Sequence, residues 1–258
     1  MAKIIAILNF KGGCAKTTTA INLAAALQIL NKKVLVVDLD FQCNATSNLG
    51  FRPNMGNTIY ELLTQKGIED MPIYEFKKGY DYIPSSKEMK NINNILVNKN
   101  NREYILRKIL HLVQPLYDYI IIDCPPNGGL LNKNAMAAAE SLLIPVECEA
   151  YSIQGVGTIL DEVKEVKDDE VNAELEILGF LLTRYDSNLS IHKAIASELR
   201  SKFQDKVFNA RIRKNTALSK ASAAHQTIYD YDKNSSGADD YMQLARELTG
   251  TKPKSKAK

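Results

Sequence analysis

A glycine-rich loop joins the first apolar run of the chain to its first helical pattern. The apolar run covers residues 4–8, the loop reads Lys-Gly-Gly-Cys-Ala-Lys-Thr-Thr over residues 11–18, and the helical pattern covers residues 17–30. Glycines let backbone N–H groups converge on phosphate oxygens, and the N-terminus of a helix adds a favourable dipole. A simple turn between a strand and a helix needs no lysines, so this loop predicts a phosphate-binding site.

The side chains of the loop have the chemistry expected beside a bound nucleotide. Lys16 offers a positive charge to the phosphates, and the Thr17 hydroxyl can ligate Mg²⁺. The ordinary pattern G-x-x-x-x-G-K-[ST] does not fit, because its two glycine positions hold Phe10 and Ala15. The loop instead has an additional lysine, Lys11, before its glycines. The residues expected to bind the nucleotide here are Lys11, Gly12, Gly13, Cys14, Ala15, Lys16, Thr17 and Thr18.

Short apolar runs alternate with helical patterns along most of the chain. The expected strands are residues 4–8, 34–37, 119–122, 142–146 and 177–182. The expected helices are residues 17–30, 102–112, 153–167 and 191–203. Strands that are apolar throughout are covered on both faces, and their alternation with helices favours parallel pairing. The sequence therefore predicts an α/β fold, with a doubly wound, mostly parallel sheet and helices on both faces.

Length and composition limit the number of domains. A chain of 258 residues that is 45% hydrophobic can bury one substantial core, so we expect a single domain over residues 1–250. Residues 251–258 are basic and of low complexity, which predicts a disordered tail. Residues 50–101 are richer in Asn, Lys and Gly and predict short helices and loops over one sheet edge. The net charge of +3 is too small to identify a nucleic-acid-binding protein by itself.

Acidic residues stand at the ends of two expected strands. Asp38 and Asp40 follow residues 34–37, and Asp123 follows residues 119–122. Doubly wound folds bind their ligands at the carboxyl ends of the strands. An apolar strand that ends in an acidic residue is typical of an element that holds Mg²⁺. A single Asp at a strand end can instead cap the next helix, but the order of loop and carboxylates favours catalysis.

These motifs together resemble the ParA/MinD superfamily of P-loop ATPases, whose loop is a deviant Walker A. The similarity lies in the loop, in Asp38 to Thr46, and in Asp123-Cys124-Pro125-Pro126. The resemblance implies catalytic roles for Lys11, Lys16 and Asp40, with Asp40 aligning the attacking water and Lys11 crossing to the nucleotide of a partner subunit. It assigns Mg²⁺ to Thr17, Asp38 and Asp123. It also implies that Asp123 and Pro125 belong to a switch that senses the γ-phosphate.

The resemblance continues into the last third of the chain, through residues 150–155, 183–186 and 206–220. It places the backbone around Arg184 and Arg213 near the adenine of the nucleotide. Related proteins bind DNA through basic residues of this region, and each cation that neutralises a phosphate adds affinity without sequence preference. The expected DNA-binding residues are Arg200, Lys202, Arg211, Arg213, Lys214 and Lys220.

The chain departs from the family pattern at several positions near the nucleotide. The family usually has glycine before its second lysine, whereas this chain has Ala15, whose Cβ resists a positive φ. Phe41 and Cys43 replace a proline and a glycine in the segment after Asp40. These changes bear on nucleotide affinity and on the rate of hydrolysis.

The resemblance implies a partition ATPase with ATP and Mg²⁺ as cofactors, whose hydrolysis is weak without a partner. An ATP-bound homodimer is expected to bind nonspecific double-stranded DNA, to respond to a ParB-like protein that binds a centromere, and to move plasmid or chromosome cargo. We expect a cytoplasmic, nucleoid-associated protein that does not bind a membrane. The four widely spaced cysteines agree with reduced thiols in the cytosol.

Three other functions compete with this one. A MinD-like ATPase that positions cell components on a membrane needs a C-terminal amphipathic helix, and this tail has no large apolar residue. An iron–sulfur ATPase could use Cys124, but the neighbouring residues do not resemble cluster ligands, so we expect Cys124 to pack in the core. A DNA-binding regulator without hydrolysis is favoured only by Phe10, Ala15 and Cys43.

Overall fold

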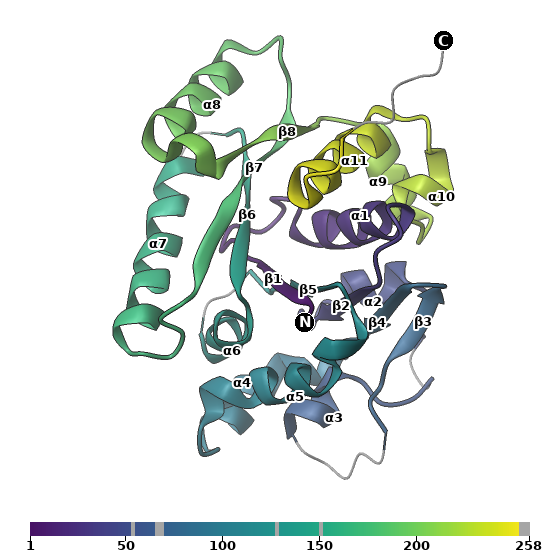
Figure 1. Ribbon diagram of the computed structural model, residues 1–258, viewed down its shortest axis with the longest axis vertical. Helices are drawn as coiled ribbons and strands as arrows, with labels where there is room; N and C mark the ends of the chain where they lie inside the picture. Colours follow the sequence, from purple (N-terminus) through teal and green to yellow (C-terminus); the bar gives the residue numbers. More distant parts are fainter. Residues whose placement is uncertain (53–54, 65–69, 127–128, 150–151, 253–258) are drawn as a thin grey trace.

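One sheet of eight strands runs through the protein, in the order β3-β4-β2-β5-β1-β6-β7-β8 (Figure 1). The computed structural model describes residues 1–52, 55–64, 70–126, 129–149 and 152–252. All neighbouring strands pair in parallel except β3, which is antiparallel to β4 at one edge. The strands are β1 Lys3–Ile7, β2 Val34–Asp38, β3 Tyr74–Lys77, β4 Tyr80–Ile83, β5 Tyr119–Asp123, β6 Ser141–Glu147, β7 Glu176–Tyr185 and β8 Val207–Arg213.

Helices cover both faces of the sheet (Figure 1). One hydrophobic cluster joins the sheet to α3 through α8, and a second joins the opposite face to α1, α2 and α11. The helices are α1 Lys16–Ile29, α2 Asn44–Asn48, α3 Ile59–Thr64, α4 Ile92–Leu96, α5 Ile105–Val113, α6 Leu130–Ala138, α7 Ser152–Asp168, α8 Ser190–Phe203, α9 Thr216–Ala223, α10 Ile228–Asp232 and α11 Ser236–Thr249.

The central strands are apolar throughout because they have a core on each side. Side chains alternate between the faces of a strand, so in β1 Ile4 and Ala6 pack into the first cluster while Ile5 and Ile7 pack into the second. This explains why continuous apolar runs, rather than alternating ones, correctly predicted β1, β2, β5, β6 and β7. The fold class expected from the sequence is confirmed.

The middle of the chain contains more sheet than the sequence indicated. Residues 50–101 hold short helices as expected, but also β3 and β4, which extend the sheet beyond β2. The expectation of helices and loops alone was wrong, because β3 is a half-exposed edge strand with the polar sequence Tyr-Glu-Phe-Lys. Of the expected tail, Thr251 and Lys252 have no regular structure, and residues 253–258 lie outside the described residues.

The C-terminal helix α11 closes the second core over α1 and β8. Tyr241 of α11 is fully buried, and its hydroxyl lies 3.2 Å from the Thr19 hydroxyl of α1. Asn22 of α1 accepts a hydrogen bond of 2.7 Å from the backbone N–H of Ile228 in α10. Helix α1 begins at the glycine-rich loop, so α10 and α11 brace the helix on which the nucleotide site depends.

We expect Leu244→Ala to lower the free energy of unfolding by about 2–5 kcal/mol, because it removes a fully buried side chain of α11 and leaves a cavity. Leu116→Ala is the matched control, since Leu116 is 60% exposed and its loss should change stability by less than about 0.5 kcal/mol. Urea unfolding measures both values. Similar losses for the two variants would contradict the placement of α11.

Candidate active site

The pairing register of three central strands brings the predicted loop and carboxylates together. Strand β5 lies between β1 and β2, and Asp123 at its end is in register with Ile7 of β1 and with Asp38 of β2. The glycine-rich loop starts after β1, so it lies over the ends of these strands. The carboxyl ends of these strands therefore bring together the loop and Asp123, which are more than 100 residues apart in the sequence.

A cavity of about 780 Å³ opens beside the loop. One wall is the loop and the start of α1, a second wall comes from the segment after β2, and a third comes from β8 and α9. This volume falls in the range of ligand pockets. The lining residues are Gly12, Gly13, Ala15, Lys16, Thr17, Thr18, Ile21, Asn22, Asp40, Gln42, Asn44, Asn48, Pro126, Arg184, Ile212, Arg213, Lys214, Asn215, Thr216, Leu218, Ser219, Ser222, Gln226 and Tyr241.

The loop is fixed to the sheet by hydrogen bonds at its base. The Asn9 side chain donates to the Pro145 carbonyl of β6 at 2.7 Å and accepts from the Lys11 backbone N–H at 2.9 Å. The Thr183 hydroxyl at the end of β7 donates to the Cys14 carbonyl at 3.2 Å. The Cys14 side chain is fully buried and does not line the cavity, so only the backbone of this predicted residue is available to a nucleotide.

Ala15 and Cys43 both adopt the left-handed backbone conformation that glycine favours. Ala15 precedes α1 with φ 71°, and Cys43 precedes α2 with φ 56°. These are two positions at which the sequence departs from the glycine of related proteins. A Cβ in this region costs about 1–2 kcal/mol. The chain thus keeps the backbone geometry of the loop and of the segment after Asp40, but with strain at both.

Lys16 lies within the loop and is only 7% exposed. Its ammonium group donates to the Lys11 carbonyl at 3.1 Å and lies 4.0 Å from the Cys14 sulfur. A buried ammonium beside converging backbone N–H groups provides a strong anion site. Lys16 lies in the cavity wall, and its role as the phosphate lysine stays a prediction.

Asp123 is fully buried, and neither of its oxygens has a hydrogen-bond partner among the described residues. Burial raises its pKa well above the usual value, and the neighbouring Asp38 raises it further, whereas the nearby Thr17 hydroxyl and Lys16 ammonium lower it. A buried carboxylate without partners is costly, and a cation would satisfy it. Thr17 and Asp123 offer the oxygen ligands that Mg²⁺ prefers, so these residues fit the ion.

Asp38 differs from Asp123 because both of its oxygens are occupied. One oxygen accepts from the Asp40 N–H at 2.9 Å, and the other accepts from the Thr46 N–H at 2.9 Å and from the Thr46 hydroxyl at 2.7 Å. Burial raises the pKa of Asp38, and the Thr46 contacts oppose the shift. In this structure Asp38 shapes the segment that carries Asp40, and its assignment to Mg²⁺ stays a prediction.

Asp40 is the carboxylate that faces the cavity. It is 6% exposed and lines the same cavity as the loop, and one of its oxygens accepts from the Gln42 N–H at 2.9 Å. A carboxylate so placed can orient a water molecule toward a phosphate held by the loop. The geometry agrees with the catalytic role predicted for Asp40.

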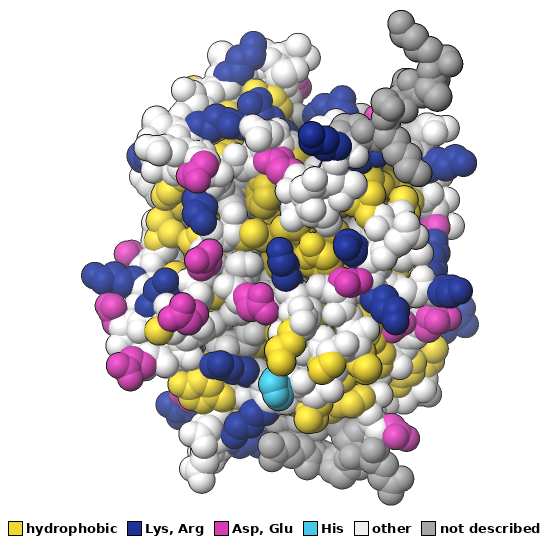
Figure 2. Space-filling model, viewed as in Figure 1, with side chains coloured by type: hydrophobic (Ala, Val, Ile, Leu, Met, Phe, Trp, Pro, Cys, Tyr) yellow, Lys and Arg dark blue, Asp and Glu magenta, His cyan; other side chains and the backbone are white. Residues whose placement is uncertain are grey.

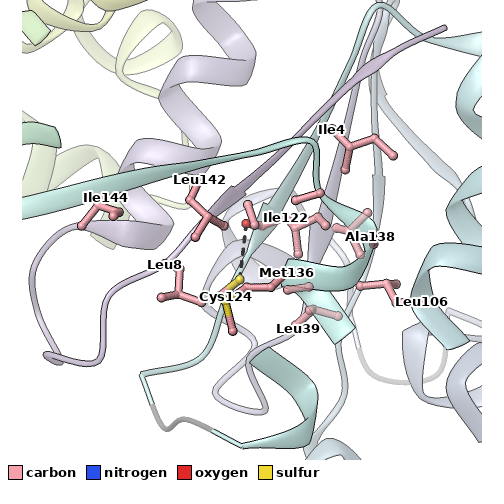
Figure 3. Packing of buried hydrophobic residues seen from close by; sticks show 14 of the residues in the cluster. Ile4, Leu8, Leu39, Leu106, Ile122, Cys124, Met136, Ala138, Leu142 and Ile144 are labelled. Carbon is pink, nitrogen blue, oxygen red and sulfur yellow. Dashed lines mark hydrogen bonds between the residues drawn. The ribbon is translucent and has the colours of Figure 1, made fainter. Parts of the chain in front are cut away.

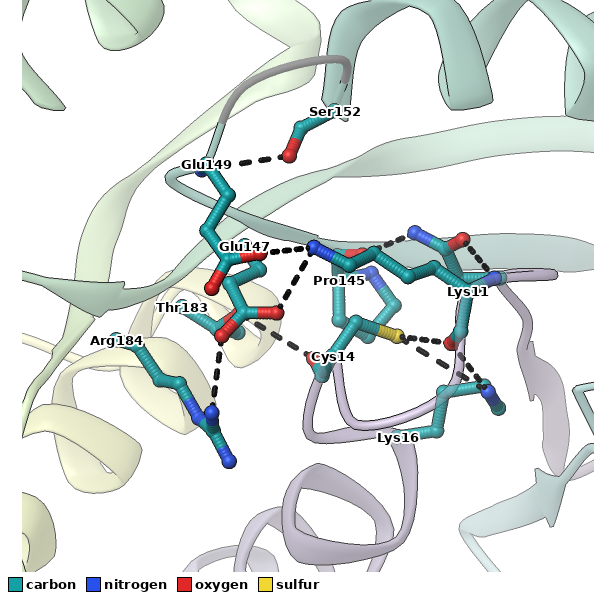
Figure 4. A network of polar contacts seen from close by, with 10 residues as sticks. Lys11, Cys14, Lys16, Pro145, Glu147, Glu149, Ser152, Thr183 and Arg184 are labelled. Carbon is teal, nitrogen blue, oxygen red and sulfur yellow. Dashed lines mark hydrogen bonds and ion pairs between the residues drawn. The ribbon is translucent and has the colours of Figure 1, made fainter. Parts of the chain in front are cut away.

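Lys11 points away from the cavity and contacts acidic residues at the end of β6 (Figure 4). Its ammonium group lies 2.5 Å from Glu149 and 3.2 Å from Glu147. Glu147 also binds the Arg184 side chain at 3.0 Å. Partial burial lowers the pKa of Lys11, but the two carboxylates outweigh it and raise the pKa. Sequence reasoning missed this cluster, because its members are far apart in the chain.

The remaining predicted residues of the switch lie at different depths. Pro126, rather than the predicted Pro125, lines the cavity, while Pro125 is buried. Cys124 packs among the side chains of the first core, including Leu8 and Met136 (Figure 3). Its thiol contacts the Ile122 carbonyl, and no group of three His, Cys, Asp or Glu residues suited to a metal occurs in the described part of the chain. The expected packing role of Cys124 is confirmed.

The predicted DNA-binding cations do not lie on one face. Arg200 and Lys202 belong to α8, which packs with the first core, and Arg211 lies over Tyr185 of the same core, whereas Arg213 contacts Asp240 of α11 beside the second core. Positive and negative side chains are intermixed over most of the face in Figure 2. Four of the six cations have partners: Arg200 with the Phe208 carbonyl, Lys202 with Glu198, Arg211 with the Tyr185 ring, and Arg213 with Asp240.

Lys214 and Lys220 differ from these four, because both are exposed and neither side chain has a contact among the described residues. Lys214 also borders the cavity. Arg213 lines the same wall, but it makes a two-pronged contact with Asp240, which is only 3% exposed. Removal of its side chain would leave buried Asp240 without its positively charged partner, so Arg213 has a structural role whatever else it binds.

Several cavity residues were not expected from the sequence. The wall formed by β8 and α9 presents polar side chains that include Asn215, Thr216 and Gln226. Asn215 caps α9 by accepting from the Ala217 N–H at 2.7 Å. An Asn just before a helical pattern was the available signal, but a cap alone does not indicate a ligand. No helix in the described part of the chain is long and apolar enough to span a membrane.

Comparison with known proteins identifies the family. A family model described as an AAA domain matches residues 2–177. The chromosome partitioning protein ParA of Myxococcus xanthus is 41% identical over 254 residues, which cover 96% of this chain and 88% of that protein. The sporulation initiation inhibitor protein Soj of Bacillus subtilis is 39% identical over 254 residues, which cover 96% of this chain and 98% of Soj. The chain belongs to the ParA/Soj family of partition ATPases.

A solved structure also resembles this ParA/Soj family member. The cobyrinic acid a,c-diamide synthase of Mycobacterium smegmatis, with a bound ATP analogue and magnesium, superposes with a TM-score of 0.86 at 28% identity. The match covers 96% of this chain and 94% of that one. Family membership and this likeness confirm the expected P-loop ATPase with ATP and Mg²⁺ as cofactors.

We expect Ala15→Gly to raise the free energy of unfolding of the nucleotide-free chain by up to about 1.6 kcal/mol. The change relieves a left-handed strain of about 1–2 kcal/mol and loses about 0.4–1 kcal/mol through the freer unfolded chain. Ala26→Gly within α1 is the control and should destabilise by about 1 kcal/mol or more, because its backbone is helical. Urea unfolding compares them; a loss of stability in both variants would show that Ala15 is unstrained.

Proposed function

We propose that this chain is an ATP-driven DNA partition switch. Its ATP-bound form is a sandwich dimer that binds nonspecific double-stranded DNA, and hydrolysis stimulated by a ParB-like partner releases it, so that plasmid or chromosome cargo moves. The proposal treats residues 1–250 as one ATPase domain acting in the cytoplasm on the nucleoid. The observation that carries it is the unpaired, buried Asp123 beneath a loop that opens onto a cavity of about 780 Å³.

The residues around the cavity divide the work of hydrolysis. Lys16 and the loop N–H groups hold the phosphates, and Asp40 orients the attacking water from the opposite wall. Mg²⁺, held through Thr17 and Asp123, supplies charge neutralisation when it is bound. Asp38 and Thr46 fix the segment on which Asp40 lies. The presence of Asp40 at the cavity and of Asp123 at the end of β5 supports hydrolysis, so a regulator without hydrolysis is the weaker proposal.

Lys11 supports the dimer because it lies outside the cavity of its own chain. A lysine on the outer side of the loop can reach the nucleotide of a second subunit, which makes ATP part of the interface. A γ-phosphate that contacts both subunits favours the dimer over the monomer, and its loss on hydrolysis removes that preference. This coupling is what a nucleotide-dependent switch requires.

Lys214 and Lys220 are the cations best placed to contact DNA. Both are exposed and without side-chain partners among the described residues, so neither has to break an ion pair to bind a phosphate. Lys214 borders the nucleotide cavity, which provides a route from the bound nucleotide to the DNA contact. Dimerisation doubles the number of such cations, so ATP strengthens DNA binding.

We expect the chain to bind a nonspecific duplex with ATP but much more weakly with ADP or without nucleotide. Binding should weaken with salt, and Lys214→Ala with Lys220→Ala should lower the slope of log affinity against log salt by about 0.9 for each phosphate that is no longer neutralised. Lys16→Ala should abolish the effect of ATP. Fluorescence anisotropy at two salt concentrations measures these affinities.

Lys108→Ala on α5 is the matched control, because Lys108 is exposed on the opposite side of the sheet from α9. Arg213→Ala is unsuitable as a test of DNA binding, since it removes the charged partner of buried Asp240. Binding that is absent or independent of nucleotide would contradict the proposal. In that case, ATP-dependent binding to anionic lipid vesicles would favour a MinD-like ATPase.

A further inference from the structure

Lys11 and Lys16 belong to the same loop but point in opposite directions (Figure 4). Lys16 lies in the cavity wall, while Lys11 extends toward the end of β6 and contacts Glu147 and Glu149. The ammonium group of Lys11 lies 2.5 Å from Glu149 and 3.2 Å from Glu147. In this position the Lys11 ammonium group lies outside the cavity of its own chain and is engaged by two carboxylates.

We infer that Glu147 and Glu149 form a latch that holds Lys11 on its own chain in the nucleotide-free monomer and opposes dimerisation until ATP binds. The inference rests on the proposed function, because it assumes that Lys11 crosses to the partner's nucleotide. It adds a regulatory role for two glutamates that belong neither to the phosphate loop nor to the group formed by Asp38, Asp40 and Asp123. It makes the monomer the resting state of the chain.

The latch can open at low cost, because neither glutamate is left stranded when Lys11 departs. Glu147 is only 5% exposed, but its other oxygen keeps the Arg184 guanidinium at 3.0 Å. Glu149 is 58% exposed and can be rehydrated. Removing one partner of a buried pair is strongly destabilising only when the remaining charge has no other partner. The contact is therefore suited to a reversible switch rather than to permanent structure.

Arg184 connects the latch to the nucleotide cavity. Its backbone is left-handed with φ 49°, the residue lines the cavity, and its guanidinium holds Glu147. The Thr183 hydroxyl beside it donates to the Cys14 carbonyl of the loop. A nucleotide that touches the cavity wall at Arg184 therefore touches the residue that binds one of the two carboxylates holding Lys11.

The expected change in the dimer Kd depends on how many Lys11 side chains must be released, which is one in each subunit. An exposed ion pair of this kind changes a local equilibrium by roughly two- to five-fold. A dimer needs two free Lys11 side chains, so removing the Glu149 contact from both subunits should tighten dimerisation by roughly four- to twenty-five-fold. Glu149→Gln is the cleaner variant, because a change at Glu147 would also release Arg184.

The experiment compares the full chain, Glu149→Gln and Glu174→Gln. Glu174 is exposed near the start of β7, at the opposite end of the sheet, and its substitution changes the net charge equally. The first readout is the rate at which an amine-reactive acetylating reagent labels Lys11 without nucleotide, followed by mass spectrometry. The second is the dimer Kd with Mg²⁺ and a non-hydrolysable ATP analogue, from analytical ultracentrifugation.

We expect Glu149→Gln to speed labelling of Lys11 about two-fold or more and to lower the dimer Kd by roughly four- to twenty-five-fold, while Glu174→Gln changes neither. An unchanged labelling rate would overturn the latch. A dimer that forms with the ATP analogue but whose Kd is unchanged by Glu149→Gln would also overturn the latch, without affecting the proposed function. Chains that all stay monomeric with the analogue would contradict both the proposed function and the latch.

Discussion

The whole site depends on the burial of one carboxylate, that of Asp123, whose oxygens have no hydrogen-bond partner in the described part of the chain. The register of β1, β5 and β2 puts Asp123 beneath the loop and beside Asp38, in a core that excludes water. Burial is the main cause of the raised pKa of Asp123 and of Asp38, and in each case a neighbouring carboxylate adds repulsion, from Asp38 on Asp123 and from Asp40 on Asp38. A cation and a nucleotide relieve this repulsion, which is why their binding can change the state of the molecule.

Other residues around the site also have backbone strain or contacts that can break. Ala15 and Cys43 have left-handed backbones, one in the loop and one in the segment after Asp40. Lys11 contacts Glu149 in a partly exposed ion pair, which can break at low cost. Natural proteins tolerate such local costs at functional sites because the rest of the fold supplies the stability. Here that stability comes from the two hydrophobic clusters and from α11, which braces the helix that follows the loop.

The sequence predicted the parts of the fold and site that depend on local patterns. The central strands, α1, α7 and the loop were predicted because continuous apolar runs and glycine spacing are visible within a few residues. Strands β3 and β4 were missed because each has only four residues and mixes polar with apolar side chains, and β3 is also a half-exposed edge strand. The contact of Arg213 with Asp240 and the contacts of Lys11 with the end of β6 join residues 27 and 138 positions apart, respectively, so no local pattern could indicate them.

The most direct test of the account is ATP hydrolysis by Asp123→Asn, measured together with thermal unfolding of the same variant without nucleotide. If Asp123 is kept unpaired for Mg²⁺, the substitution should lower Mg²⁺-dependent turnover by about ten-fold or more while the unfolding temperature stays the same or rises. Unchanged turnover would contradict this account. So would a large loss of stability in which activity falls only as much as the folded fraction does, because Asp123 would then serve the core rather than the reaction.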